Sequence, residues 1–236
     1  MKKPVLLCII FFTLISSLYS QSRLSNNGNF YMGGGYSLLI FTNSDAYSIY
    51  PVVNFNASSF MSEFTVNAGY KFNKNIAVEF DPGIIWARAQ SNNGFYFNDG
   101  VNRYFYQPLQ SDMFAMPLNI KVKIFPFVSK ERAFTDDIYF GIGGGAVFIS
   151  EQYNNSLYAD NTLNGYFTTR TASNTLWRPD AFLSLGIDFS NKYGFGLEGS
   201  YRFVPLATKG TQPVITSIAS NFNSVNLALK VLLNFY

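Results

Sequence analysis

Carboxylate and ammonium groups recur at every second position in this sequence. Glu79 and Asp81 are two residues apart, and so are Lys121 and Lys123. Neighbouring carboxylates can act as general acid and general base, which makes Glu79 and Asp81 candidates for proton-transfer chemistry. Carboxylates that share a buried face with lysines instead form structural ion pairs. Because lysines recur here at the same spacing, we favour ion pairs over catalysis.

The sequence lacks the residue types on which most other catalytic and metal sites depend. The sequence contains no histidine, which is the commonest metal ligand and the base of serine–histidine–acid sites. Its single cysteine, Cys8, lies in a segment that we expect to be removed, which excludes disulfides and thiolate catalysis. We therefore predict no catalytic residue, no metal site, no cofactor, and a protein that is not an enzyme.

The first 20 residues have the pattern of a secretory signal. Lys2–Lys3 precedes an apolar run, Val5–Leu18, and Ser20 supplies a small residue before a cleavage site. We predict export through the Sec pathway, removal of the signal peptide 1–20, and one domain over residues 21–236. An uncleaved anchor is the alternative, although the run is shorter than the roughly 20 apolar residues of a spanning helix.

The composition suits a membrane protein without spanning helices. Aromatic residues make up 18% of the chain and charged residues only 13%, about half the usual share. Without Lys2 and Lys3, the basic residues fall from 17 to 15 against 14 acidic ones, so the balance gives no argument for nucleic acid. After the leader, no run of about 20 apolar residues remains. The other structure that can cross a bilayer is a closed β-barrel.

Eight segments alternate apolar and polar residues with the period of two that β-strands require. Short turns and long connections join them, as in outer-membrane barrels. We predict an all-β fold, namely an eight-stranded antiparallel up-and-down transmembrane β-barrel. Pro82 and Pro117 interrupt two segments and predict bulges or local kinks. The strands expected are Asn29–Phe41, Met61–Phe72, Asn75–Ala87, Asp112–Phe125, Ile138–Ser150, Asp180–Phe189, Tyr193–Val204 and Ser224–Tyr236.

A weak internal repeat accompanies these segments. Gly69–Glu79 resembles Gly186–Glu198, and three consecutive glycines at 33–35 are matched at 143–145. Both pairs are half a barrel apart. A duplicated hairpin explains this pattern, and so does the demand for glycine in any narrow barrel.

The motif Gly-Tyr-x-Phe at Gly69–Phe72, the alternating strands and the aromatic C-terminus resemble the eight-stranded outer-membrane barrel superfamily of the OmpA transmembrane domain, OmpX and OmpW. The resemblance implies a monomer in the bacterial outer membrane, in contact with lipid and lipopolysaccharide and with no nucleic-acid partner. It also implies periplasmic chaperones and a barrel-assembly machinery that reads the C-terminal segment. Here that signal is Leu229, Val231, Leu233, Phe235 and the additional residue Tyr236.

Charged side chains gather on the face of the strands opposite the apolar one. A lysine or arginine facing lipid near the bilayer centre costs about 2–4 kcal/mol, so this face must point inward. An eight-stranded barrel is just wide enough for side chains to fill it. We predict a salt-bridge network that closes the lumen, with a polar constriction of a narrow pore as the alternative. Its residues are Glu63, Lys71, Glu79, Asp81, Lys121, Lys123, Asp188, Glu198, Arg202 and Lys230.

Two long outer connections, 88–111 and 151–179, are rich in Tyr and Asn. Asp99–Gly100 predicts a hairpin that extends the adjoining strands beyond the membrane. The leading hypothesis is a structural or loop-presenting barrel. The alternatives are a narrow porin, transport of hydrophobic solutes as the resemblance to OmpW implies, and a surface adhesin or ligand-binding barrel. Candidate contact residues for the last are Phe95, Tyr96, Phe97, Tyr104, Phe105 and Tyr106.

Overall fold

The structure, a computed structural model, describes residues 29–50, 53–54, 59–89, 95–98, 100–127, 134–160, 162, 164–166, 168–189, 193–206 and 214–235. The predicted signal peptide and Tyr236 lie outside these ranges. Within them, no helix has the length and apolar character needed to cross a membrane.

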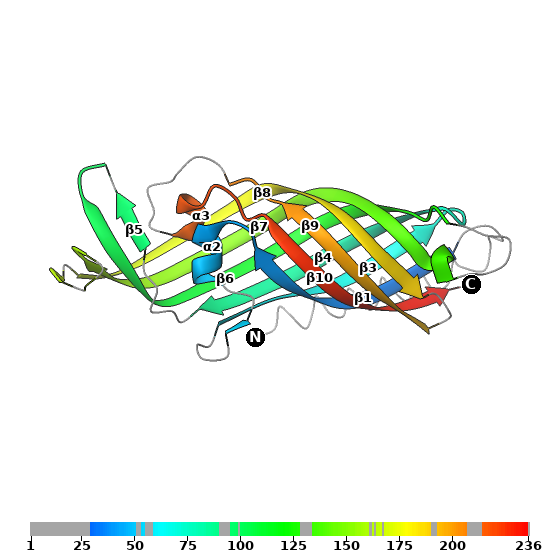
Figure 1. Cartoon of the computed structure of the whole chain (residues 1–236), viewed down its shortest axis with the longest axis horizontal. Coiled ribbons are helices and arrows are strands. Elements are labelled where there is room, and N and C mark those ends of the chain that lie inside the picture. Colours follow the sequence, from blue (N-terminus) through cyan, green and yellow to red (C-terminus); the bar gives the residue numbers. More distant parts are fainter. Residues whose placement is uncertain are drawn as a thin grey trace, which may run out of the picture.

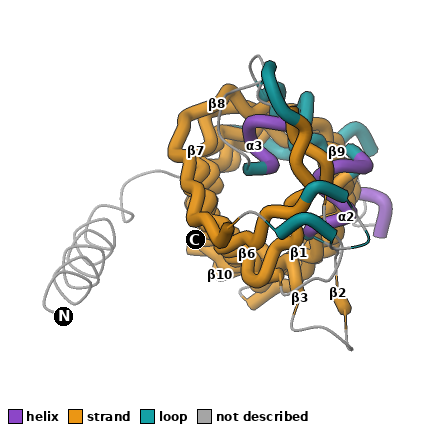
Figure 2. Tube along the Cα trace, turned by 90° about the vertical axis from the view of Figure 1, so that its left-hand side faces the viewer, coloured by secondary structure: helices purple, strands orange, loops and turns teal. Residues whose placement is uncertain are grey.

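Eight strands of this part of the chain form one closed antiparallel ring (Figure 2). The ring closes through the first strand, where Phe30 lies opposite Phe235 on one side and Tyr70 on the other. The predicted fold class is therefore confirmed. In order around the ring, the strands are β1 (Asn29–Phe41), β10 (Ser224–Phe235), β9 (Tyr193–Phe203), β8 (Thr168–Phe189), β7 (Ile138–Tyr158), β6 (Arg103–Ile124), β4 (Ile76–Ala89) and β3 (Ser59–Lys71).

A tight turn joins β3 to β4, and an asparagine side chain supplies the hydrogen-bond acceptor for two backbone N–H groups of this turn. The Asn73 side-chain oxygen accepts hydrogen bonds from the backbone N–H groups of Asn75 and Ile76, at 2.8 and 2.9 Å. The C-terminal residue of β10, Phe235, lies at the same end of the ring as this turn, and we call it the turn end. The 3-10 helix η2 (Phe134–Asp137) precedes β7 there.

The outer surface of the ring is an apolar belt. On β8, Leu183 and Leu185 are each 54% exposed, whereas Phe182 and Ser184 between and beside them are buried. This follows from the period of two, because successive side chains on a strand point to opposite faces. Aromatic side chains edge the belt at both ends, including Trp86, Phe114 and Trp177 at one end and Tyr70, Phe72, Tyr193 and Phe195 at the other.

Three strands are much longer than the others. β6, β7 and β8 have 22, 21 and 22 residues, whereas the other ring strands have 11 to 14. Their far ends project beyond the ring together with β5 (Phe95–Asn98), at the left of Figure 1. We call this side the extended end. The two-residue β2 (Val53–Asn54) adds to the edge of β3.

The extension corrects the predicted strand boundaries. Residues 103–111, 151–158 and 168–179 belong to strands, with a register shift between Pro108 and Gln110, so placing 151–179 wholly in a loop is wrong. Beyond the apolar belt the outer face of a strand meets water and need not be apolar, so the alternation of apolar and polar residues that marks a strand weakens. The predicted hairpin is confirmed, because Asn98 pairs with Arg103 around Gly100, whose φ is +96°.

The predicted bulges at Pro82 and Pro117 are absent from the ladders. Thr65 faces Gly83 and Ala68 faces Phe80 in an unchanged register, although the ladder is interrupted between them. The register around Pro117 is also unshifted. Proline removes a donor, which interrupts hydrogen bonding without inserting a residue.

Two short helices lie at the extended end. They are α2 (Ser44–Ile49), which follows β1, and α3 (Ile215–Ile218), which precedes β10. Figure 2 shows α3 inside the ring of strands. Asn43 caps α2 by accepting from the N–H groups of Asp45 and Ala46. Both helices pack on an apolar interior that we call the mouth cluster, which includes Leu39, Ala46, Tyr50, Met113, Ile149, Val214 and Ile215.

Candidate functional site

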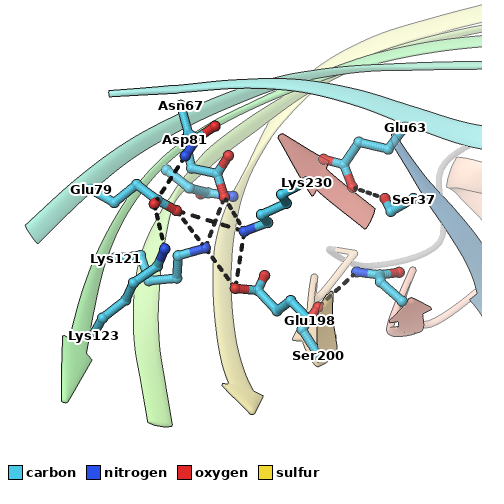
Figure 3. Close-up of polar contacts among 12 residues, drawn as sticks. Ser37, Glu63, Asn67, Glu79, Asp81, Lys121, Lys123, Glu198, Ser200 and Lys230 are labelled. Carbon is cyan, nitrogen blue, oxygen red and sulfur yellow. Dashed lines mark hydrogen bonds and ion pairs between the residues drawn. The ribbon is translucent and has the colours of Figure 1, made fainter. Parts of the chain in front are cut away.

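The interior nearer the turn end is a buried ion network (Figure 3). The Lys121 ammonium lies 2.7 Å from Glu79 Oε1, 2.8 Å from Glu198 Oε2 and 3.2 Å from Asp81 Oδ2. Glu79 belongs to β4 and Glu198 to β9, which are four places apart in a ring of eight. One ammonium therefore connects opposite walls of the barrel.

Two further lysines complete this network. Lys123 Nζ lies 2.6 Å from Glu79 Oε2 and 2.8 Å from Asp188 Oδ2. Lys230 Nζ lies 3.0 Å from Glu198 Oε2 and 3.7 Å from Glu79 Oε1. Glu79, which is fully buried, thus contacts three ammonium groups. Burial of charges is tolerated only when they are paired and hydrogen-bonded in this way.

Two tyrosines from opposite strands flank the network. Lys123 Nζ lies 5.3 Å from the ring centre of Tyr31 on β1 and 4.7 Å from that of Tyr139 on β7, in cation–π geometry. The Tyr139 hydroxyl also donates to Glu198 Oε2 at 2.5 Å. The Lys123 ammonium is therefore held by the carboxylates of Glu79 and Asp188 and by two aromatic faces.

Each tyrosine lies across a glycine of the neighbouring strand. Tyr31 pairs with Gly69, and Tyr139 pairs with Gly186. A Cβ atom at either glycine would overlap the tyrosine ring. Glycine is required at both positions because the ring occupies the space of a side chain.

These residues recur at corresponding places in the two halves of the ring. Residues of the same type recur four strands apart, so each glutamate meets lysines from both halves of the ring. The related pairs are Tyr31 with Tyr139, Gly69 with Gly186, Glu79 with Glu198, and Lys121 with Lys230.

A second ion cluster lies next to the first, toward the extended end. Arg202 Nη2 lies 2.9 Å from Glu63 Oε1, and Arg202 Nε lies 3.4 Å from Asp180 Oδ2. Asn119 donates to the same Asp180 oxygen at 2.8 Å, and Ser37 donates to Glu63 at 3.4 Å. This cluster joins β3, β8 and β9 beneath the mouth cluster.

The structure brings nine of the ten predicted interior charges into these two clusters. Lys71 lies instead at the turn end, half-buried, with Nζ 4.2 Å from the centre of the Phe125 ring. The two clusters together hold six acidic and four basic side chains, rather than five of each. Neutral donors serve the additional carboxylates, namely Tyr139, Asn67, Asn119 and Ser37.

Sequence reasoning missed Asp180, Tyr31 and Tyr139 as interior residues. Asp180 begins the predicted strand Asp180–Phe189, and it lies eight residues before Asp188 and hence on the same face of that strand. Tyr31 and Tyr139 alternate with outward apolar residues, so the period could have placed them inside. Their apolar character made them resemble belt residues.

The arrangement offers little scope for catalysis. In both clusters, each carboxylate lies within 4 Å of a lysine or arginine, and the carboxylates are buried except Asp81, whose side chain is 11% exposed. Among the residues that the structure describes, no group of His, Cys, Asp or Glu is arranged to hold a metal ion. The carboxylates are neutralised by fixed cations rather than exposed to a substrate.

The predicted loop contacts occupy different environments. Tyr96 is exposed and Tyr104 is half-buried, whereas Phe105 and Tyr106 are 8% and 1% exposed. The side chains of Phe95 and Phe97 are outside the described part. Arg103 stacks over the Tyr96 ring at 3.9 Å. In the predicted assembly signal, Leu229, Val231 and Leu233 face outward on β10. The ring centre of Phe235 lies 5.9 Å from the ring centre of Phe30, and Tyr236 is outside the described residues.

The fold and interior define the class of the protein. It is a closed eight-stranded antiparallel β-barrel with an apolar outer belt and a charged interior, the fold implied by the resemblance to the OmpA transmembrane domain, OmpX and OmpW.

Several solved barrels resemble the chain. Neisserial surface protein A (NspA) is 11% identical with a TM-score of 0.43, over 87% of this chain and 97% of that one. Ail of Yersinia pestis, in complex with the heparin analogue sucrose octasulfate, is 11% identical with a TM-score of 0.40, over 89% and 99%. CarO of Acinetobacter baumannii is 8% identical with a TM-score of 0.41, over 84% and 95%. No family model matches the sequence, and no curated protein is significantly similar to it.

Proposed function

We propose that this protein is an integral barrel of the bacterial outer membrane that conducts no solute and supports a strand-built extension outside the cell. The apolar belt with aromatic edges supports the membrane location, because such girdles lie at the two bilayer interfaces. The short turn at Asn73–Asn75 supports a periplasmic position for the turn end. The extended end then faces the exterior.

The observation that carries the proposal is the position of Lys121 between Glu79 and Glu198 on opposite walls. Because the eight-stranded lumen is narrow, a bridge of this kind fills its width. Above it, the mouth cluster leaves a cavity of about 20 Å³ between residues such as Leu39, Met113 and Val147. A cavity of that size has room for about one water molecule and for no larger solute. The ion network and the mouth cluster thus close the lumen at two successive depths.

Single-channel recording tests the closed lumen. The protein, refolded into lipid and checked for strand-rich circular dichroism, is expected to give no steady currents in planar bilayers. Steady channels of folded protein would contradict the closure. They would make the network a polar constriction and put the narrow porin or hydrophobic-solute barrel first.

We infer the remaining partners from the same surfaces. The belt contacts outer-membrane lipid, and the extended end lies next to lipopolysaccharide. The outward row Leu229, Val231 and Leu233 on β10 suits reading by periplasmic chaperones and the barrel-assembly machinery. Transfer of these residues to a reporter barrel, with and without Leu→Ser changes, tests that assignment by its assembly yield.

Surface recognition is the second candidate function. The extension exposes Val101, which is 87% accessible, together with Tyr96 and Tyr166. Rigid tyrosines on a strand platform suit adaptable contacts with a partner. Serine at Tyr96 and Val101 should abolish binding to host-cell surfaces while leaving the ring folded. Binding that is unchanged in this variant would exclude the hairpin as the contact.

A further inference from the structure

Two connections of the chain fold into the mouth of the barrel at the extended end. α2 and α3 contact each other's segments, since Asn43 donates to Ser220 Oγ at 3.2 Å and Thr42 N–H donates to the Asn223 carbonyl at 2.9 Å. Ala46 and Ile215, one from each helix, are no more than 1% exposed. Together the two helices cover the mouth cluster as a roof.

One carboxylate holds both parts of this roof. Glu151 of β7 points inward and is 1% exposed. Its Oε1 accepts from the Tyr50 hydroxyl at 2.9 Å and from the Ile215 N–H at 3.2 Å, and its Oε2 accepts from the Thr216 N–H at 2.8 Å. Tyr50 ends α2, and the two amides begin α3. A residue of the barrel wall thus connects two segments that are more than 160 residues apart in the chain.

Glu151 lies past the apolar belt, because Phe148 is the last apolar outward residue of its strand and Ser150 is hydrogen-bonded to Thr175 on the outer face. The titratable groups that face its carboxylate are Tyr50 and Tyr153. Its ladder neighbours on β6 and β8, Met113 and Asn174, are uncharged.

The largest influence on this carboxylate is burial, which raises the pKa of Glu151, whereas hydrogen bonds from Thr216, Tyr50 and Tyr153 oppose the rise. Burying a carboxylate without a cationic partner costs free energy unless hydrogen-bond donors surround it. Two of these donors, Thr216 and Tyr50, come from the roof, so the roof and the carboxylate stabilise each other.

We propose that Glu151 is a latch that holds α2 and α3 in the mouth as a roof that can be displaced while the ring of strands stays folded. The helices have six and four residues, and helices so short are not stable without tertiary contacts. The ring is held by continuous ladders that do not involve them. Asn174 of β8 donates to Thr216 Oγ1 at 3.0 Å and so provides a second, weaker contact between the barrel wall and α3. This closure goes beyond the proposed ion network and is independent of it.

Cysteine labelling tests the latch. Cys8 is the only cysteine in the sequence and lies in the predicted leader, so the mature barrel offers a clean background. Ala219→Cys, a buried position directly after α3, reports on the roof. Ala77→Cys, buried at the turn end, reports on the ring, and Asp45→Cys, exposed on α2, gives the unprotected rate. A water-soluble maleimide is applied to each in reconstituted barrels.

Glu151→Ala removes the acceptor of three donors, which should speed labelling of Ala219→Cys at least about ten-fold. Ala77→Cys should remain protected. Glu151→Gln keeps one oxygen that can accept from the Thr216 N–H, but its NH2 group faces the Ile215 N–H, so it should restore only part of the protection. Labelling of Ala219→Cys that stays slow in Glu151→Ala would overturn the latch. Labelling that accelerates equally at Ala77→Cys would overturn the independence of roof and ring.

Discussion

Lys121 of β6 and Glu198 of β9 meet at 2.8 Å, although their strands are three places apart in the ring. Such a contact is possible only across the lumen. The distance between these two side chains therefore depends on the inner width of the barrel. Because that width is set by the number of strands, the ion pair fits a barrel of eight strands.

Lys121→Met should destabilise the barrel by about 3–5 kcal/mol, because it leaves Glu79, Asp81 and Glu198 buried with one cation fewer. Urea unfolding in lipid vesicles measures the change. The matched control is Arg88→Gln, which removes an exposed ion pair with Asp112 on the outer face and should cost less than about 1 kcal/mol. Equal losses in the two variants would contradict a special role for the buried network.

Lys71→Met should cost about 1 kcal/mol or less, since the ammonium is half-buried at the turn end and stacks on Phe125. The same unfolding measurement applies. A loss as large as that of Lys121→Met would place Lys71 inside the energetic network, as the sequence alone suggests.

Gly69→Ala and Gly186→Ala should each destabilise the barrel by about 1–3 kcal/mol, because the new methyl group displaces the ring of Tyr31 or Tyr139. Gly199→Ala is the control, since its nearest neighbour would be 4.0 Å away. Resistance of the folded band to heating in gel electrophoresis ranks the three variants. If Gly199→Ala proves the most harmful, tyrosine packing is not the cause.

The roof should be tightest in acid. Burial raises the pKa of Glu151 in the closed roof above its ordinary value, so the closed state binds the proton more strongly than the open state. This stabilisation is full below the ordinary pKa and is lost as pH rises through the raised one. Labelling of Ala219→Cys, normalised to Asp45→Cys, should accelerate over that window and become independent of pH in Glu151→Gln. A pH dependence that persists in Glu151→Gln would assign it to another group.

The barrel itself was predictable because lipid imposes a period of two on the outer face. Leu183 and Leu185 must be apolar there, and Asp188 must turn inward, whatever the rest of the chain does. The repeat of Gly69–Glu79 in Gly186–Glu198 also falls on strands four places apart in the ring. Strand ends were not predictable, since the outer face of the extension lies beyond the lipid and need not be apolar, whereas its inner face packs on residues such as Tyr153 and Ala172.

The roof could not be predicted for a related reason. Glu151 looked like the first residue of a polar loop because its partners, Tyr50 and Thr216, are distant in sequence and ordinary in type. Lys71 was misplaced because the period gives the face of a strand but not the depth of a side chain along the lumen. Only the register, with Asn29 opposite Lys71, puts that lysine at the rim.

The long sequence separations in the interior set an order of assembly. Arg202 and Glu63 are 139 residues apart, and Lys121 and Glu198 are 77 apart. Contacts so distant form late, because the chain between them must first be placed. Before β10 joins β1, the charged faces of the early strands would lie unpaired in or against hydrocarbon, a state that costs several kcal/mol for each charge. Stepwise entry of single strands is therefore unfavourable, and we expect insertion and ring closure to be one concerted event.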